Sequence, residues 1–76
     1  MITQRLTLTI LDDIASEAAV GALTRELEDV PGVMRAYVNP STEMAYIQAD
    51  TTLTDTALLV RAAERAGFHA GPPSRR

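Results

Sequence analysis

The stretch PGVMRAYVNPSTEMAYIQAD, residues 31–50, predicts a β-hairpin. Residues 33–38 and 44–49 each alternate between apolar side chains and larger or polar ones, the pattern of a half-buried strand. Between them, residues 39–42 (NPST) have the composition of a turn. Since successive side chains of a strand point to opposite faces, one face of the hairpin is expected to pack on a core. That face holds Ala36, Val38, Ala45, Ile47 and Ala49.

The other face of the hairpin is a candidate interaction surface. Its members are Arg35, Tyr37, Met44 and Tyr46, and parity adds Gln48 from the hairpin and Arg5, Thr7 and Thr9 from an earlier strand. Tyr, Met and Arg are enriched at protein interfaces, and both tyrosines of the chain lie in this hairpin. The alternative is an ordinary solvated sheet face. Met34 is a candidate core filler.

The segments on either side of the hairpin predict the remaining elements. Residues 5–10 (RLTLTI) alternate as a strand does, and a helical spacing of apolar residues then leads to Pro31-Gly32. Thr54-Asp55 offers an N-cap for a second helix, and Gly67 is placed to end it. Residues 68–70 can supply only a short last strand. The apolar positions of the two helices are Val20, Leu23, Leu27, Val30, Leu59, Ala62, Ala63 and Ala66.

This order predicts an α+β fold, a ferredoxin-like βαββαβ sandwich in which two helices cover one face of a four-stranded antiparallel sheet. At 76 residues the chain is one domain, and we expect the domain to span residues 1–70 and a flexible tail to span residues 71–76.

Composition narrows the classes of function. The formal net charge is −3, which argues against a general attraction to nucleic acid. The chain has no Cys, so it forms neither a disulfide nor a thiolate metal site. No signal peptide or membrane-spanning apolar run is evident, and we expect a cytoplasmic protein without membrane insertion.

Four short stretches carry a resemblance to a known family: Pro31-Gly32-Val33, Val38-Asn39, Asp50 and Gly67-Phe68. They are similar, in sequence and in joint spacing, to the heavy-metal-associated (HMA) domain of copper chaperones, metal-transporting ATPases and the periplasmic mercury carrier. From residue 14 to residue 70 the register needs no gap. The first strand lies one residue earlier than in the family, which indicates one extra residue in the loop of residues 11–13 or, alternatively, a slip of the strand.

The resemblance implies a soft-metal site that this chain does not keep. Counting back from Gly32, Ser16 falls on the first Cys of the family's C-x-x-C motif and Ala19 on the second. A serine hydroxyl does not ionise near neutral pH and alanine offers no ligand, whereas soft ions such as Cu(I) prefer thiolates. We therefore expect no cofactor and no tight soft-metal binding.

Acidic residues near this position suggest two alternatives. Asp12, Asp13, Ser16 and Glu17 are close enough in sequence to bind a hard cation weakly. Capping of the helix by Asp13 or Asp12 is the ordinary explanation, because acids complement a helix N-terminus. His69 is a lone imidazole on the short last strand and is not expected to be a ligand.

An enzyme is not expected, because the sequence shows no nucleophile–base pair and no phosphate-binding loop. The leading hypothesis is an HMA-like protein with a degenerate C-x-x-C motif. It would act as a non-catalytic interaction module linked to metal handling, with a protein partner or self-association and without nucleic acid. The alternatives are an ACT-like small-molecule sensor, which shares the βαββαβ order, and the weak hard-metal site at the acidic loop.

Overall fold

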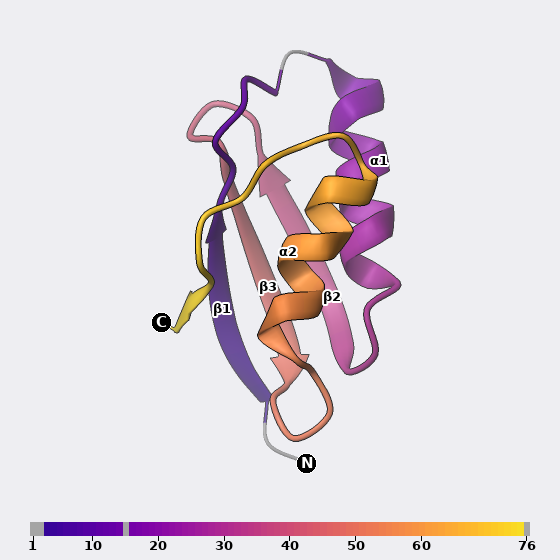
Figure 1. Ribbon diagram of the computed structural model, residues 1–76, viewed down its shortest axis with the longest axis vertical. Coiled ribbons are helices and arrows are strands. Elements are labelled where there is room, and N and C mark those ends of the chain that lie inside the picture. Colours follow the sequence, from indigo (N-terminus) through magenta and orange to yellow (C-terminus); the bar gives the residue numbers. More distant parts are fainter. Residues whose placement is uncertain (1–2, 15, 76) are drawn as a thin grey trace.

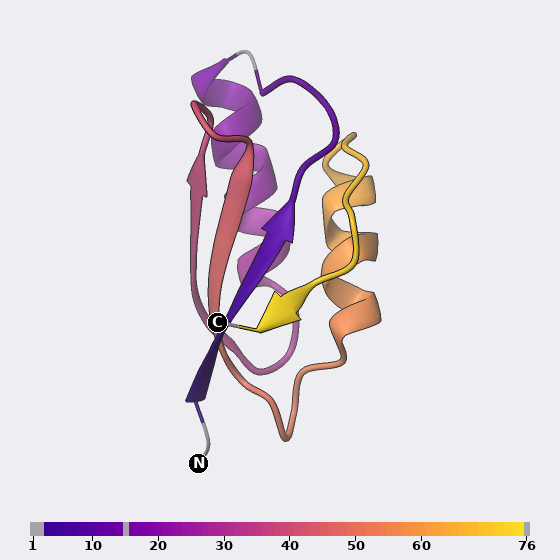
Figure 2. The same ribbon diagram turned by 90° about the vertical axis from the view of Figure 1, so that its left-hand side faces the viewer.

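The computed structural model describes residues 3–14 and 16–75, with the backbone alone at Arg75. Its elements in chain order are β1 (Thr3–Thr9), α1 (Glu17–Glu28), β2 (Val33–Asn39), β3 (Met44–Asp50), α2 (Thr56–Arg65) and β4 (Ser74–Arg75). Both helices lie on one side of the sheet (Figures 1 and 2). The predicted hairpin is therefore present as β2 and β3.

The sheet has three full strands, β1, β2 and β3, and a short fourth strand, β4, at one edge. Its order is β2-β3-β1-β4, and every pair is antiparallel, but β4 has only two residues. The short strand predicted at residues 68–70 is not formed, since these residues contribute a single bridge, Ile10 to Ala70. The chain then runs beside β1, where Gly71 N–H donates to the carbonyl of Thr9 at 2.8 Å and Ser74 pairs with Thr7.

The core lies between the sheet and the helices, and the alternation in the sequence predicted its sheet side. Its members are Leu6, Leu8, Ile10, Ile14, Leu23, Leu27, Val30, Ala36, Val38, Ala45, Ile47, Ala49, Leu59, Ala62, Ala63 and Phe68. All are at most 9% exposed. Burying such side chains stabilises a domain by about 1.5–3 kcal/mol for each large one. The two layers therefore meet through apolar packing.

Met34 is an exception to the predicted core. The pairing of β2 with β3 shifts between Val33 and Arg35, so Met34 is the extra residue of an irregularity in the strand. Its side chain is 54% exposed. The prediction of core filling was wrong because the bulge turns this residue out of the alternation.

The second helix ends as its sequence predicted. Asp55 is its N-cap and accepts a hydrogen bond from Ala57 N–H at 3.0 Å. At the other end, Gly67 has φ +92°, its N–H donates to Glu64, and Phe68 N–H donates to Ala63. These two bonds form a Schellman motif, which needs a residue that tolerates positive φ.

No helix in the described part of the chain is long and apolar enough to cross a membrane. Residues 1, 2, 15 and 76, which belong to the predicted domain and tail, lie outside the described residues. The boundary predicted at residue 70 stays a prediction.

Candidate functional site

A pair of tyrosines lies on the face of the sheet that the helices leave uncovered. Tyr37 of β2 is directly opposite Tyr46 of β3. Their rings stack with centroids 6.3 Å apart and an interplanar angle of 21°. Tyr37 is 60% exposed, while Tyr46 is half-buried. Cross-strand aromatic pairs of this kind stabilise a sheet and also offer an apolar surface to a partner.

Two arginines occupy the next row of the same face. The register pairs Arg35 of β2 with Gln48 of β3, and Gln48 with Arg5 of β1. All three side chains are exposed. The two rows border a shallow groove of about 410 Å³, and its lining residues are Arg5, Arg35, Ala36, Tyr37, Tyr46, Ile47 and Gln48. We call this feature the outer-face groove.

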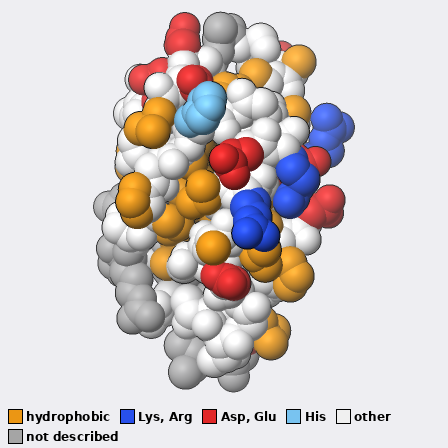
Figure 3. Space-filling model, in the orientation of Figure 1, with side chains coloured by type: hydrophobic (Ala, Val, Ile, Leu, Met, Phe, Trp, Pro, Cys, Tyr) orange, Lys and Arg blue, Asp and Glu red, His pale blue; other side chains and the backbone are white. Residues whose placement is uncertain are grey.

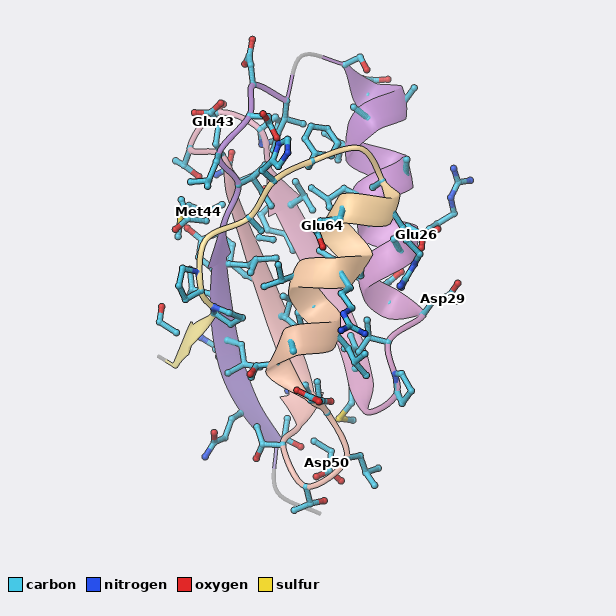
Figure 4. The ribbon with its side chains drawn as sticks, viewed as in Figure 1. Glu26, Asp29, Glu43, Met44, Asp50 and Glu64 are labelled. Atoms are coloured by element: carbon cyan, nitrogen blue, oxygen red, sulfur yellow. The ribbon has the colours of Figure 1, made fainter. Side chains whose placement is uncertain are left out.

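Met44 lies beyond the tyrosine pair, where β3 begins. Its sulfur accepts a hydrogen bond from the Thr9 hydroxyl at 3.5 Å. It follows Glu43 of the hairpin turn, which has φ +56°, and Figure 4 shows both residues at the end of the sheet opposite Asp50. Met44 does not line the groove. Of the four predicted interaction residues, the structure therefore brings Arg35, Tyr37 and Tyr46 together.

The loop between β1 and α1 differs from its prediction in how the helix is capped. Ser16 is the N-cap of α1, and its hydroxyl accepts a hydrogen bond from Ala19 N–H at 3.1 Å. The predicted capping by Asp13 or Asp12 was wrong, because the helix begins later, at Glu17. Glu17 lies in the first turn, where a negative charge complements the helix dipole.

Asp12 instead holds the segment that follows α2. Its Oδ2 accepts a hydrogen bond from His69 N–H at 2.5 Å and lies 3.0 Å from His69 Nδ1. The backbone hydrogen bond from His69, followed by the one from its side chain, lowers the pKa of the Asp12 carboxyl below its ordinary value. Neighbouring backbone bonds run from Leu11 N–H to the His69 carbonyl and from Gly71 N–H to Thr9. The acidic loop is thus fastened to residues 69–71.

The donor set near this loop does not suit a soft metal ion. The chain has no thiolate, Ser16 Oγ is engaged in capping, and Ala19 has no donor atom in its side chain. Within the described residues, no group of three or more His, Asp or Glu side chains is placed to hold a metal ion.

Two residues of the outer-face groove, and one contact of the loop between β1 and α1, were not predicted from the sequence. The alternation along the strands placed Arg5 and Gln48 on the outer face, but they were not among the predicted interaction residues. Aligning the predicted strands side by side would have shown that they neighbour Arg35. The contact between Asp12 and His69 joins residues 57 apart in sequence, and no local signal predicts it.

Comparison with solved structures shows what this arrangement is similar to. The N-terminal domain of PacS from Synechocystis PCC6803 is 31% identical, with 90% of this chain and 94% of that chain covered and a TM-score of 0.76. Oxidized MerP from Ralstonia metallidurans CH34 is 24% identical, with coverage of 92% and 96% and a TM-score of 0.81. A copper binding domain from HMA7, a P-type ATPase, is 20% identical, with coverage of 96% and 97% and a TM-score of 0.87. No protein-family model and no curated protein sequence matches the chain.

The fold and these neighbours define a small α+β domain of the ferredoxin-like class, with two helices on one face of an antiparallel sheet. Within that class, the chain belongs to the heavy-metal-associated domain family.

Proposed function

We propose that this protein is a non-catalytic member of the HMA family that acts through protein contacts and does not carry a soft metal ion. It acts in a cellular system that handles metal ions. This setting is supported by the functions of structural neighbours, which include a metallochaperone, CopZ, and a copper binding domain of a P-type ATPase.

The observation that carries the proposal is the complete absence of Cys from the chain. Soft ions such as Cu(I) prefer soft sulfur ligands, above all thiolates. In the register with the family, the two thiolate positions fall on Ser16 and Ala19. The first of these side chains caps α1 and the second is a methyl group. Neither of them replaces a thiolate.

The interaction surface that we propose is the uncovered sheet face with Arg35, Tyr37, Met44 and Tyr46. Tyr37 is one of the four exposed large hydrophobic side chains among the described residues, and it stacks on Tyr46. Exposed aromatics next to arginines are typical of the energetic centres of interfaces.

Metal competition tests the first half of the proposal. The wild-type protein, titrated with Cu(I) against a chromogenic chelator at neutral pH, is expected to leave the chelator complex intact. A Ser16→Cys/Ala19→Cys variant is expected to withdraw one Cu(I) per chain, because it restores two thiolates three residues apart at the start of α1. The single variants Ser16→Cys and Ala19→Cys are matched controls and should compete far less well.

Two results would contradict the proposal. A stoichiometric Cu(I) complex of the wild-type protein that survives the chelator would show a soft-metal site. A double-Cys variant that folds, as judged by circular dichroism, yet does not bind Cu(I) would show that Ser16 and Ala19 are not the thiolate positions. Native mass spectrometry of protein purified from its own cells then reports any retained partner or ion.

A further inference from the structure

We propose that the outer-face groove binds an acidic peptide segment of a partner protein, with two carboxylates on Arg5 and Arg35 and an apolar side chain on Tyr37. This inference rests on the proposed interaction role and names the chemistry of the partner.

The two arginines are a local excess of positive charge on an acidic protein. The formal net charge of the chain is −3. In the described part of the chain, Arg65 forms an ion pair with Glu26 and the His69 ring contacts the Asp12 carboxylate, and neither contact involves Arg5 or Arg35. On the helix side of the molecule, by contrast, acidic and basic side chains are intermingled (Figure 3). The sheet face is therefore the side that attracts a negatively charged partner.

Asp50, the acidic residue within the described strands of the sheet, forms no ion pair with these arginines. Asp50 lies at the end of β3, opposite Thr3, and is 8% exposed. Its Oδ1 accepts hydrogen bonds from the hydroxyl of Thr52 at 2.6 Å and from its N–H at 3.0 Å. The Asp50 carboxylate is thus used within its own turn, and no ion pair among the described residues engages Arg5 or Arg35.

The spacing of the row suits a peptide better than a single small anion. Arg5 and Arg35 are two strands apart with Gln48 between them, which places their Cα atoms roughly 10 Å from each other across the sheet. A guanidinium binds a carboxylate through two parallel hydrogen bonds. Two carboxylates on one chain can therefore each engage an arginine, while the Gln48 amide is placed to bond the backbone between them.

The tyrosine row supplies the apolar half of the recognition. Tyr37 presents more than half of its surface, and its ring stacks on that of Tyr46. A rigid aromatic surface next to arginines loses little conformational entropy on binding. An apolar side chain of the peptide, placed beside its carboxylates, would cover the ring.

The test uses a fluorescein-labelled synthetic peptide in which two glutamates flank a phenylalanine, and its binding to the full chain is followed by fluorescence anisotropy. Arg5→Gln, Arg35→Gln and Tyr37→Ala are each expected to weaken binding about tenfold. Arg61→Gln on α2 is the matched control, because it removes the same charge from an exposed position in the helix layer. It should leave binding within about twofold. Replacing both glutamates of the peptide by glutamine should abolish binding.

Several outcomes would overturn the inference. Equal losses in Arg61→Gln and Arg35→Gln would mean that only net charge matters. Tighter binding of a single-stranded oligonucleotide of the same charge would make the surface a nucleic-acid site. Self-association in sedimentation velocity that is lost in Arg5→Gln and Arg35→Gln would make a second copy of the chain the occupant. No binding of the glutamate peptide would refute the acidic-peptide assignment.

The failure of this inference is distinguishable from failure of the proposed function. If the glutamate peptide does not bind while Cu(I) competition stays negative, only the partner chemistry is wrong. If the wild-type protein withdraws Cu(I) from the chelator, the proposed function is wrong whatever the peptide does.

Discussion

The side chain of Thr54 packs closely against Gly32. Its hydroxyl donates a 2.9 Å hydrogen bond to the carbonyl of Pro31 and lies against the point that a Cβ on Gly32 would occupy. Gly32 has φ +88°, and a Cβ there would also lie 2.9 Å from Leu53 Cβ and 3.0 Å from the backbone nitrogen of Thr54. The turn before β2 is thus locked to the loop before α2, and only glycine fits.

Gly32→Ala is expected to destabilise the fold by about 2–4 kcal/mol, since it adds a steric clash to the strain of a positive φ. Gly67→Ala is the matched control, because φ is +92° there but the space around a Cβ is open. It should cost only about 1–2 kcal/mol. Gly21→Ala, inside α1 with open space, should stabilise by about 0.5–1 kcal/mol. Urea unfolding of the four proteins measures the series, and equal costs for Gly32→Ala and Gly67→Ala would contradict the close packing.

Replacing the cap of α1 gives a second prediction. Ser16→Ala removes the oxygen that accepts from Ala19 N–H and should cost about 1 kcal/mol of unfolding free energy. Asp13→Ala is the control, and it should cost less than about 0.5 kcal/mol because Asp13 is an exposed residue outside the helix. If Asp13→Ala proved the more costly of the two, the helix would start earlier than the structure shows.

The carboxyl of Asp50 gives a prediction about pH. The hydrogen bond from the Thr52 hydroxyl, followed by that from its N–H, lowers the pKa of Asp50 below its ordinary value of 3.8. The folded state therefore favours the ionised carboxyl. Its contribution to stability is complete above the unfolded pKa and is lost as the pH falls through the lower, folded value. Stability should accordingly decline below about pH 4.

An NMR titration of the Asp50 side-chain carbon checks the cause of this shift. Thr52→Val removes the hydroxyl but keeps the shape of the side chain, and it should raise the pKa of Asp50 toward its ordinary value. An unchanged titration in Thr52→Val would mean that the hydroxyl is not what lowers the pKa.

Much of the fold could be predicted because the periodic spacing of apolar residues extends over most of the chain. The alternation of residues 33–38 and 44–49 assigned Ala36, Val38, Ala45, Ile47 and Ala49 to the core, and all five are buried. The second helix was predicted from its cap and its terminal glycine. These features are local, so a single sequence contains them.

The errors arose where a residue far away in sequence decides the structure. Residues 68–70 have strand-like composition, yet Asp12 and the backbone around Leu11 hold His69 in a loop. The bulge that exposes Met34 is set by its pairing with β3. The start of α1 depended on a choice among Asp12, Asp13 and Ser16 that composition alone does not make.

Only part of the candidate site was predicted, because its geometry also depends on residues that are far apart in sequence. The alternation of side chains along each strand predicted which residues lie on the outer face. Only the cross-strand register shows that Arg35, Gln48 and Arg5 form one row beside the tyrosines. The interaction role, the cytoplasmic location, the ACT-like alternative and weak hard-metal binding at the acidic loop all remain predictions.

The last prediction compares the two faces of the sheet through one alanine substitution on each. Ile47 of β3 is 1% exposed, is opposite Ala36 and Leu6, and belongs to the core, so Ile47→Ala should cost about 2–5 kcal/mol. Tyr37 is on the outer face and 60% exposed, and Tyr37→Ala should cost only about 1 kcal/mol, mainly through the lost stacking on Tyr46. Urea unfolding at neutral pH measures both. A cost of Tyr37→Ala as large as that of Ile47→Ala would mean that the ring has a structural role, and the outer face would then be a second packed surface. The expected small cost would leave Tyr37→Ala folded, so that any loss of peptide binding in this variant reports on recognition and not on stability.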